Sequence, residues 1–313
     1  MFNLNSDNSE LLRRVAWLYH EEGLNQQDIA DRLRLSRTKV LRVLKECRDT
    51  GLVKVSLDVA TGVLFGMEER MREVFGLDEC LVTPAAGEPM QSVAKALAYR
   101  FEEALRTCSS IGLGGGRTLH AFAQRFDPPE NMCTREVIIL VGNTKANYAI
   151  EPYEIVSILA SKLAVDVYNV WAPAKVNNAK EAELIKSVPS ISKVLKMGEK
   201  VDVAFLGIGD MAKSSYIRYG YLSEEKVASY VRAGAIGEVL GRFFTIDGEI
   251  IEKNFNQLFI SVPMPLKSKA IGFAGGIEKV SAILGALRTG WLSGLITDEF
   301  TAAALLEAAR NGK

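Results

Sequence analysis

Two patterns of apolar residues divide the chain near residue 78. Over the first fifty residues, apolar side chains recur every three or four positions, which is the spacing of helices with one buried face. It predicts a helix over residues 11–20, a helix of about two turns after Asn25, and a further helix after Ser36. The buried stripe of this last helix is expected from Val40, Leu41, Val43 and Leu44. Alternation over Leu52–Val59 predicts a short strand.

The helix that follows Ser36 is strongly basic. Five basic residues and no acidic residue lie between Arg34 and Lys45. Asn25 and Ser36 are good N-caps, and Arg34 and Leu35 form a short turn between the two helices. This combination is typical of a helix-turn-helix whose second helix enters a DNA groove. The alternative is a helical hairpin whose basic residues only face solvent.

The expected DNA contacts come from the starts of both helices, where free backbone N–H groups and polar side chains can reach phosphates and base edges. They are Gln26, Gln27, Ser36, Arg37, Thr38, Lys39 and Arg42. The whole chain carries 38 basic and 38 acidic residues, so this positive charge is a local feature. The expected partner is double-stranded operator DNA.

From residue 80 onward, short apolar runs alternate with helical stretches, which predicts a mostly parallel sheet covered by helices on both faces. The runs expected as strands are Cys80–Thr83, Ser109–Leu113, Val137–Val141, Val167–Trp171, Val203–Ile208, Arg242–Ile246, Ala270–Ala274 and Gly294–Thr297. The predicted fold class is α/β, with a homeodomain-like or winged helix-turn-helix and a Rossmann-like domain. The expected boundaries are 1–56 for the DNA-binding domain, 57–78 for a helical linker and 79–313 for an effector-binding and oligomerisation domain.

A glycine-rich loop is the strongest candidate for a ligand site. After a predicted strand, Gly114, Gly115 and Gly116 lead into a helix that begins near Arg117 and Thr118. Glycines let backbone amides turn toward an anion, and the helix start adds partial positive charge. This arrangement suits a sugar phosphate or a polyol, although a tight turn without a ligand is the alternative. It matches neither a Walker loop nor a full dinucleotide fingerprint.

Further loops follow other predicted strands. Leu206–Asp210 and Ala274–Lys279 are rich in glycine, and Lys279 is placed to reach a phosphate or hydroxyl oxygen, unless it is only a surface lysine. Glu238 could accept hydrogen bonds from sugar hydroxyls or cap a helix.

Composition argues against several other classes of protein. Hydrophobic content of 48% with no bilayer-length apolar run, and a polar, acidic start, favour a cytoplasmic protein without a membrane partner. The four cysteines lack metal-binding or redox spacing, so no metal and no cofactor is expected. The only histidines are His20 and His120, and no nucleophile with a base can be assembled from motif spacing. No catalytic residue is therefore assigned, and the protein is predicted not to be an enzyme.

Several motifs, in order along nearly the whole chain, resemble the SorC/DeoR family of sugar-responsive bacterial transcriptional regulators. They are LNQQDIADRLRLSRTKVLRVLKECRDTGLVKV, IGLGGGRTL, VDVAFLGIGD, RYGYLSEE, GAIGEVLGRFF, AGGIEKVSAILGAL and GLITDEFTAAALL. The resemblance implies a dimeric or tetrameric regulator of a carbohydrate operon, whose effector domain resembles sugar-phosphate isomerases but only binds its ligand. The implied effector site comprises Gly112, Gly114, Gly116, Arg117, Thr118, Leu119, Gly207, Gly209, Glu238, Thr245 and Lys279.

The chain departs from the family pattern at several of these positions. Gly114 and Gly115 stand where the family often has Ser-Trp, and Thr245 replaces the Asp of Phe-Phe-Asp. Some members use a lysine at the position of Val141 to form a Schiff base; here the nearest lysine, Lys145, lies four residues further on. Covalent capture of an aldehyde sugar is therefore not expected, and the effector is expected to differ from the usual sugar phosphates.

The sequence thus predicts a DNA-binding transcriptional regulator of a carbohydrate-utilisation operon, controlled by a sugar, polyol or sugar-phosphate effector. Two alternatives remain open. One is a sugar-phosphate isomerase or deaminase with an accessory helix-turn-helix. The other is a carbohydrate-binding interaction module without a role on DNA.

Overall fold

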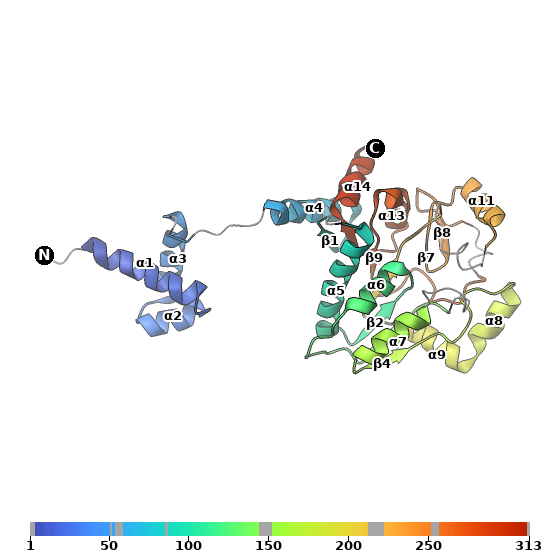
Figure 1. Ribbon diagram of the computed structural model, residues 1–313, viewed down its shortest axis with the longest axis horizontal. Helices are drawn as coiled ribbons and strands as arrows, with labels where there is room; N and C mark the ends of the chain where they lie inside the picture. Colours follow the sequence, from blue (N-terminus) through green and yellow to red (C-terminus); the bar gives the residue numbers. More distant parts are fainter. Residues whose placement is uncertain are drawn as a thin grey trace. The chain divides into compact units, whose positions relative to one another are not determined.

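The computed structural model describes residues 4–50, 52–53, 59–84, 87–143, 152–211, 222–251 and 257–311. The chain forms two compact units, Met1–Thr61 and Gly62–Lys313 (Figure 1). Among the helices of the described ranges, none is long and apolar enough to cross a membrane.

The first unit is a three-helix module made of α1 (Leu4–His20), α2 (Gln26–Leu33) and α3 (Arg37–Asp49). Its helices share one apolar core, to which the main contributors are Val15, Leu18, Ile29, Val40, Val43 and Cys47. The Sγ atom of Cys47 lies 3.3 Å from the carbonyl oxygen of Leu12, which links α3 to α1. The helix predicted over residues 11–20 is confirmed and begins earlier, at Leu4.

The end of this module differs in part from the prediction. Val53 packs against the three-helix core. The predicted strand Leu52–Val59 falls mostly on residues 54–58, which lie outside the described residues, and Val59 already belongs to helix α4 (Val59–Phe75).

The second unit is built around a seven-stranded parallel sheet in the order β1-β10-β9-β5-β2-β3-β4. Its strands are β1 (Glu79–Thr83), β2 (Ser110–Leu113), β3 (Glu136–Ile139), β4 (Asp166–Tyr168), β5 (Val203–Gly207), β9 (Lys269–Phe273) and β10 (Gly294–Asp298). The mostly parallel α/β sheet is thereby confirmed. Most of its strands are short and buried on both faces, which explains why they appear in the sequence as apolar runs.

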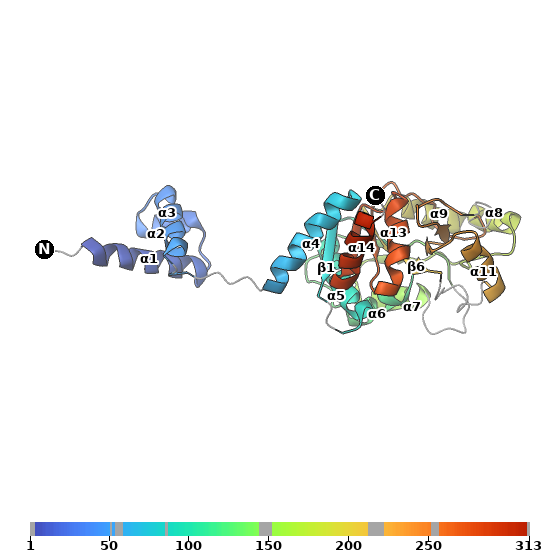
Figure 2. The same cartoon turned by 90° about the horizontal axis from the view of Figure 1, so that it is seen from above.

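Helices cover both faces of this sheet (Figures 1 and 2). Strand residues such as Ile111 and Phe205 pack with α5 (Pro89–Thr107), α6 (Arg117–Arg125) and α7 (Pro152–Lys162) on one face. The neighbouring Ala204 and Leu206 point to the opposite face. The helices on that side are α4, α9 (Pro189–Gly198), α13 (Val280–Arg288) and α14 (Glu299–Asn311). Helices α8 (Ala179–Ser187) and α11 (Glu224–Arg232) complete the described helices of this unit.

One predicted strand belongs elsewhere. Residues 242–246 were expected in the main sheet, but β8 (Arg242–Phe244) pairs antiparallel with β7 (Gly237–Val239) in a separate small sheet that also contains β6 (Gly209–Asp210). The left-handed φ angles of Leu240 (49°) and Gly241 (76°) form the tight turn that lets β8 return along β7.

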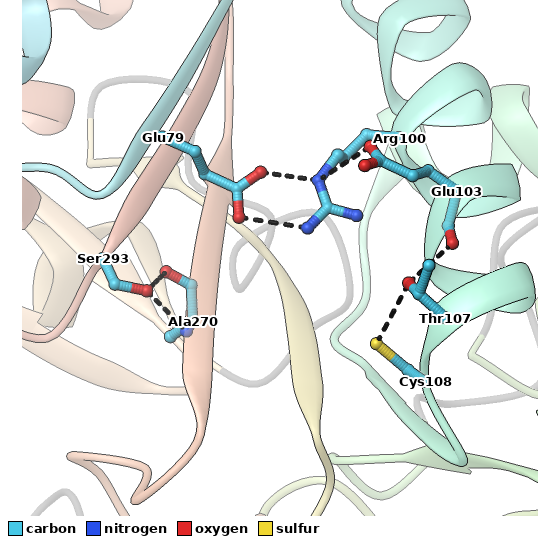
Figure 3. Close-up of polar contacts among 7 residues, drawn as sticks. All are labelled: Glu79, Arg100, Glu103, Thr107, Cys108, Ala270 and Ser293. Atoms are coloured by element: carbon cyan, nitrogen blue, oxygen red, sulfur yellow. Dashed lines mark hydrogen bonds and ion pairs between the residues drawn. The ribbon is translucent and has the colours of Figure 1, made fainter.

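Polar contacts fix the edge of the main sheet where β1 begins (Figure 3). The guanidinium of Arg100 on α5 donates to both carboxylate oxygens of Glu79, at 2.5 and 3.1 Å. On the other side of β1, the carboxylate of Glu68 on α4 accepts from the backbone N–H of Val82 at 2.8 Å. β1 is an edge strand of the sheet. The two contacts attach it to α5 on one face and to α4 on the other.

Candidate functional site

The turn between α2 and α3 has the geometry of a helix-turn-helix. The side chain of Asn25 accepts from the backbone N–H groups of Gln27 and Asp28, at 2.9 and 3.0 Å. Arg34 closes α2 in the left-handed conformation, with φ 52° and ψ 44°, and Ser36 caps α3 by accepting from Lys39 N at 3.1 Å. The predicted caps and turn are therefore confirmed, and they fix the direction in which α3 leaves the turn.

The two sides of α3 differ in chemistry. The buried side consists of Val40, Val43, Leu44 and Cys47. The exposed side consists of Arg37, Thr38, Leu41, Arg42 and Lys45. Leu41 was predicted to be buried and this was wrong: its side chain is 46% exposed, because Val40, Val43 and Leu44 already close the core.

The other expected DNA contacts differ in how exposed they are. Lys39 is half-buried, and Gln26 is half-buried at the start of α2. Gln27 is exposed, but its amide donates to Asp31 at 3.0 Å. Its side chain is thus engaged within its own helix.

In the second unit, the carboxyl ends of β9, β5 and β2 lie next to one another in the sheet, and three glycine-rich loops start there. Gly114 N donates to the carbonyl of Phe205 at 2.9 Å. A Cβ atom on Gly207 would lie 2.8 Å from the carbonyl oxygen of Gly115. These two loops approach so closely that only glycine fits between them.

The first of these loops ends at the start of α6. Gly116 has a φ angle of 115°, a conformation that side chains rarely adopt, and it offers no side-chain cap. Helix α6 begins at Arg117, so the backbone N–H groups of its first turn have no capping side chain. A helix start of this kind attracts anions.

Lys279 lies where the third loop ends in the short helix η1 (Ile277–Lys279). Its ammonium donates to the carbonyl of Ile208 at 3.1 Å. Burial lowers the pKa of Lys279; the charge of Asp210 opposes this, and the charge of Arg117 adds to it. Glu238 and Glu278 also act on this lysine, so the three loops meet at Lys279.

Glu238 is held across the small sheet. It pairs with Gly209 in the register of β6 and β7, and its Oε2 accepts from Gly241 N at 3.0 Å. A side chain at Gly209 would collide with the Glu238 carboxylate. Because Gly209 has no side chain, there is room for the Glu238 carboxylate at this position, next to Asp210 in the chain.

Three of the expected effector residues have other surroundings. Gly112 lies inside the sheet against Leu140 and Val201, and Leu119 is fully buried in the core of one face. The hydroxyl of Thr245 accepts from the backbone N–H groups of its own turn, those of Asp247 and Glu249. Gly112 and Leu119 therefore contribute to the packing of the core.

The sequence analysis missed two polar features. Asp210 ends the short strand β6, and its charge acts on Lys279. Asp298, which is fully buried at the end of β10, accepts from Gly276 N at 2.9 Å and from the hydroxyl of Thr301 at 2.6 Å. Asp298 also accepts from Thr301 N at 3.0 Å, and an Asp directly before a helical pattern is an N-cap signal that could have revealed this part of its role.

The remaining candidates lie apart. The Nε2 atom of His120 on α6 lies 3.1 Å from Oε1 of Glu154 on α7. Val141 bridges to Ser261, and Lys145 lies outside the described residues. In the described ranges, no group of three or more His, Cys, Asp or Glu residues is placed to hold a metal ion.

Comparisons with known proteins agree with both units. Residues 18–54 match the family described as "Winged helix-turn-helix DNA-binding", and residues 62–307 match the "Putative sugar-binding domain" family. The erythritol catabolism regulatory protein EryD of Brucella abortus (strain 2308) is 32% identical over 311 residues, covering 97% of this chain and 98% of the relative. The sorbitol operon regulator of Klebsiella pneumoniae is 28% identical over 322 residues, covering 97% and 99%.

Solved structures show the same fold. The full-length sorbitol operon regulator SorC from Klebsiella pneumoniae superposes with a TM-score of 0.72 at 24% identity, covering 95% of this chain and 98% of that one. A DeoR family transcriptional regulator from Listeria monocytogenes gives a TM-score of 0.70 at 23% identity, covering 78% and 99%.

The two units define a DNA-binding transcriptional regulator with a sugar-binding domain. The chain belongs to the SorC/DeoR family of sugar-responsive bacterial regulators, as its motifs predicted.

Proposed function

We propose that the protein controls a carbohydrate-utilisation operon by binding operator DNA through α3 and a sugar, polyol or their phosphate beside Lys279. One observation carries the effector part: Lys279, Arg117, Asp210 and Glu238 converge where three neighbouring parallel strands end. Ligands of open α/β sheets bind at the carboxyl ends of the strands.

The chemistry of this site suits a hydroxylated ligand that carries negative charge. Lys279, Arg117 and the uncapped N–H groups of α6 can donate to a phosphate or hydroxyl oxygen. The carboxylates of Asp210 and Glu238 can accept from sugar hydroxyls. Gly114, Gly116, Thr118, Gly207 and Gly209 form the remainder of the proposed site, and Thr245 is included only because the family resemblance implies it.

The relatives narrow the ligand further. One relative is named for erythritol catabolism and another for the sorbitol operon, and both substances are acyclic polyols. We therefore propose a polyol or a polyol phosphate as the effector.

On DNA, the proposed contacts are Gln26, Gln27, Ser36, Arg37, Thr38, Lys39 and Arg42. Among them, the exposed cations Arg37 and Arg42 lie on the outer side of α3. A homodimer or homotetramer would present two such helices to a palindromic operator. The effector must bind one arrangement of the subunits better than the other, because equal binding would shift nothing.

A ligand screen tests the effector proposal. Purified full-length protein is heated with erythritol, sorbitol, pentoses, hexoses and their phosphates, and the binding ligand raises the unfolding temperature. The same ligand then changes the affinity for DNA upstream of the gene, by roughly five- to 150-fold for a typical coupling. If no polyol, sugar or phosphate changes either quantity, the proposed effector class is wrong.

The remaining rival is an enzyme of the isomerase or deaminase class. We propose that the protein is not an enzyme and that it acts in the cytoplasm, because its relatives are regulators. Turnover of a pentose or hexose phosphate by the purified protein would contradict this proposal.

A further inference from the structure

An apolar side chain lies within the basic outer face of α3. Leu41 is 46% exposed. Each helical residue is rotated by about 100° from the last, so the exposed residues of α3 span an arc of roughly 140°. These residues are Arg37, Thr38, Leu41, Arg42 and Lys45. Leu41 lies inside this arc, one turn after Arg37 and one turn before Lys45.

Packing within the module does not account for this leucine. The opposite side of α3 already supplies four buried residues to the core. A single exposed leucine is ordinary on a protein surface. Here, however, all the other exposed residues of the arc are cationic or carry a hydroxyl, and no acidic residue lies between Arg34 and Lys45.

This face complements one particular surface. A cationic helix face attracts the phosphate backbone, and its centre then meets the floor of the major groove. The apolar group that projects into this groove is the C5-methyl of thymine, and aliphatic side chains recognise it by contact. The arginines at neighbouring positions can bond to polar base edges or phosphates, whereas Leu41 offers the largest apolar side chain of this face to such a methyl.

We propose that Leu41 determines operator specificity by packing against the methyl group of a thymine in each half-site. This inference rests on the proposed function, since it requires that α3 enters the major groove. It predicts which base pair the operator carries opposite the second turn of α3, namely T·A.

The test isolates the methyl group. Full-length protein first selects its preferred sequence from a library of duplexes with a randomised central segment. Each thymine of the selected duplex is then replaced in turn by deoxyuridine, which lacks only the C5-methyl. For the wild-type protein, we expect one replacement per half-site to weaken binding by about fourfold, the value for withdrawing one methyl-sized apolar group from contact.

The variant Leu41→Ala should lose this response. It should bind the thymine and deoxyuridine duplexes equally, and the thymine duplex at least about fourfold more weakly than the wild type does. Alanine favours helix and the side chain lies outside the core, so the module stays folded. Leu184→Ala, at a leucine that is 69% exposed on α8, is the matched control and should behave as the wild type.

The outcomes separate the two levels of the proposal. A defined operator whose deoxyuridine series affects wild type and Leu41→Ala equally overturns the role of Leu41 and leaves DNA binding intact. Failure to select any sequence overturns the proposed operator binding, and the role of Leu41 with it.

Discussion

At the scale of single residues, Lys279 is the most informative position. Its half-buried ammonium donates to the Ile208 carbonyl, and the charges of Arg117, Asp210 and Glu238 act on it. Lys279→Met keeps most of the side-chain volume and removes the charge. We expect effector affinity to fall roughly ten- to 100-fold, as when a hydrogen bond to a charged group is lost, while DNA binding persists.

Isothermal titration with the ligand found by thermal screening measures this loss. Lys180→Met, at an exposed lysine on α8, is the control and should titrate as the wild type. An unchanged affinity for Lys279→Met would remove the lysine from the site.

The ionisation of Lys279 also predicts a pH dependence. Burial lowers its pKa below the ordinary value of 10.5, so between the two values the unfolded chain binds more protons than the folded protein. Stability from this group therefore rises with pH across that alkaline window. In urea unfolding from pH 7.5 to 10, wild type should gain stability relative to Lys279→Met. A constant difference between the two proteins would contradict the lowered pKa.

On the DNA-binding module, Arg37 is the exposed cation in the first turn of α3. Arg37→Ala should weaken binding to the selected operator by about 1–3 kcal/mol without altering the fold. Arg13→Ala, an exposed arginine of α1 in the same module, controls for net charge. Fluorescence anisotropy with a labelled duplex measures the affinity of both variants. Equal losses of affinity would mean that binding depends only on the net charge of the module.

At the scale of elements, the close approach of two loops predicts a contrast between two glycines. Gly207→Ala would place a Cβ 2.8 Å from the Gly115 carbonyl oxygen, so the loops after β2 and β5 must separate. We expect effector affinity to fall at least about tenfold and the free energy of unfolding to fall by about 1–3 kcal/mol. Calorimetry and urea unfolding measure the two quantities.

Gly66→Ala is the matched control for this change. Gly66 lies within α4, and nothing lies within 4 Å of the position of its Cβ. Alanine there should stabilise the protein by about 0.5–1 kcal/mol with no effect on effector binding. Similar losses from the two substitutions would contradict the importance of the loop contact.

The elements also show what the sequence could predict. The main-sheet strands were found because parallel strands buried on both faces are short apolar runs. The small sheet was missed because β6 has only two residues and β7 three, too few for an alternating pattern. Leu41 was misplaced because apolar spacing alone does not show where a core is already full.

The candidate site was only partly predictable from the sequence. Its glycine loops and Lys279 could be found because glycine clusters at strand ends are visible in the sequence. The roles of Asp210 and Asp298 could not be predicted from the sequence. The role of a single carboxylate depends on the groups that it contacts, and these can lie far away in the chain. For Asp298 this group is Gly276, which lies 22 residues earlier in the chain.

For the whole molecule, the distribution of charge predicts how binding responds to salt. The chain has zero formal net charge, yet the outer face of α3 is cationic. Operator affinity should fall steeply with salt, with a slope of about −0.9 for each phosphate neutralised. The slope should become about one unit shallower for a variant that lacks a phosphate-contacting lysine. Filter binding from roughly 50 to 300 mM salt measures this slope. An affinity that does not change with salt would contradict the DNA interface.

The bond between Lys279 and the Ile208 carbonyl has a consequence for nutrient sensing. Before any metabolite arrives, the ammonium already has an oxygen partner from the chain itself. An ammonium has three N–H groups, so one is held toward this carbonyl and the other two remain to bond to a ligand. In the site that we propose, this bond orients the ammonium in advance. Less conformational entropy is then lost when the metabolite is bound.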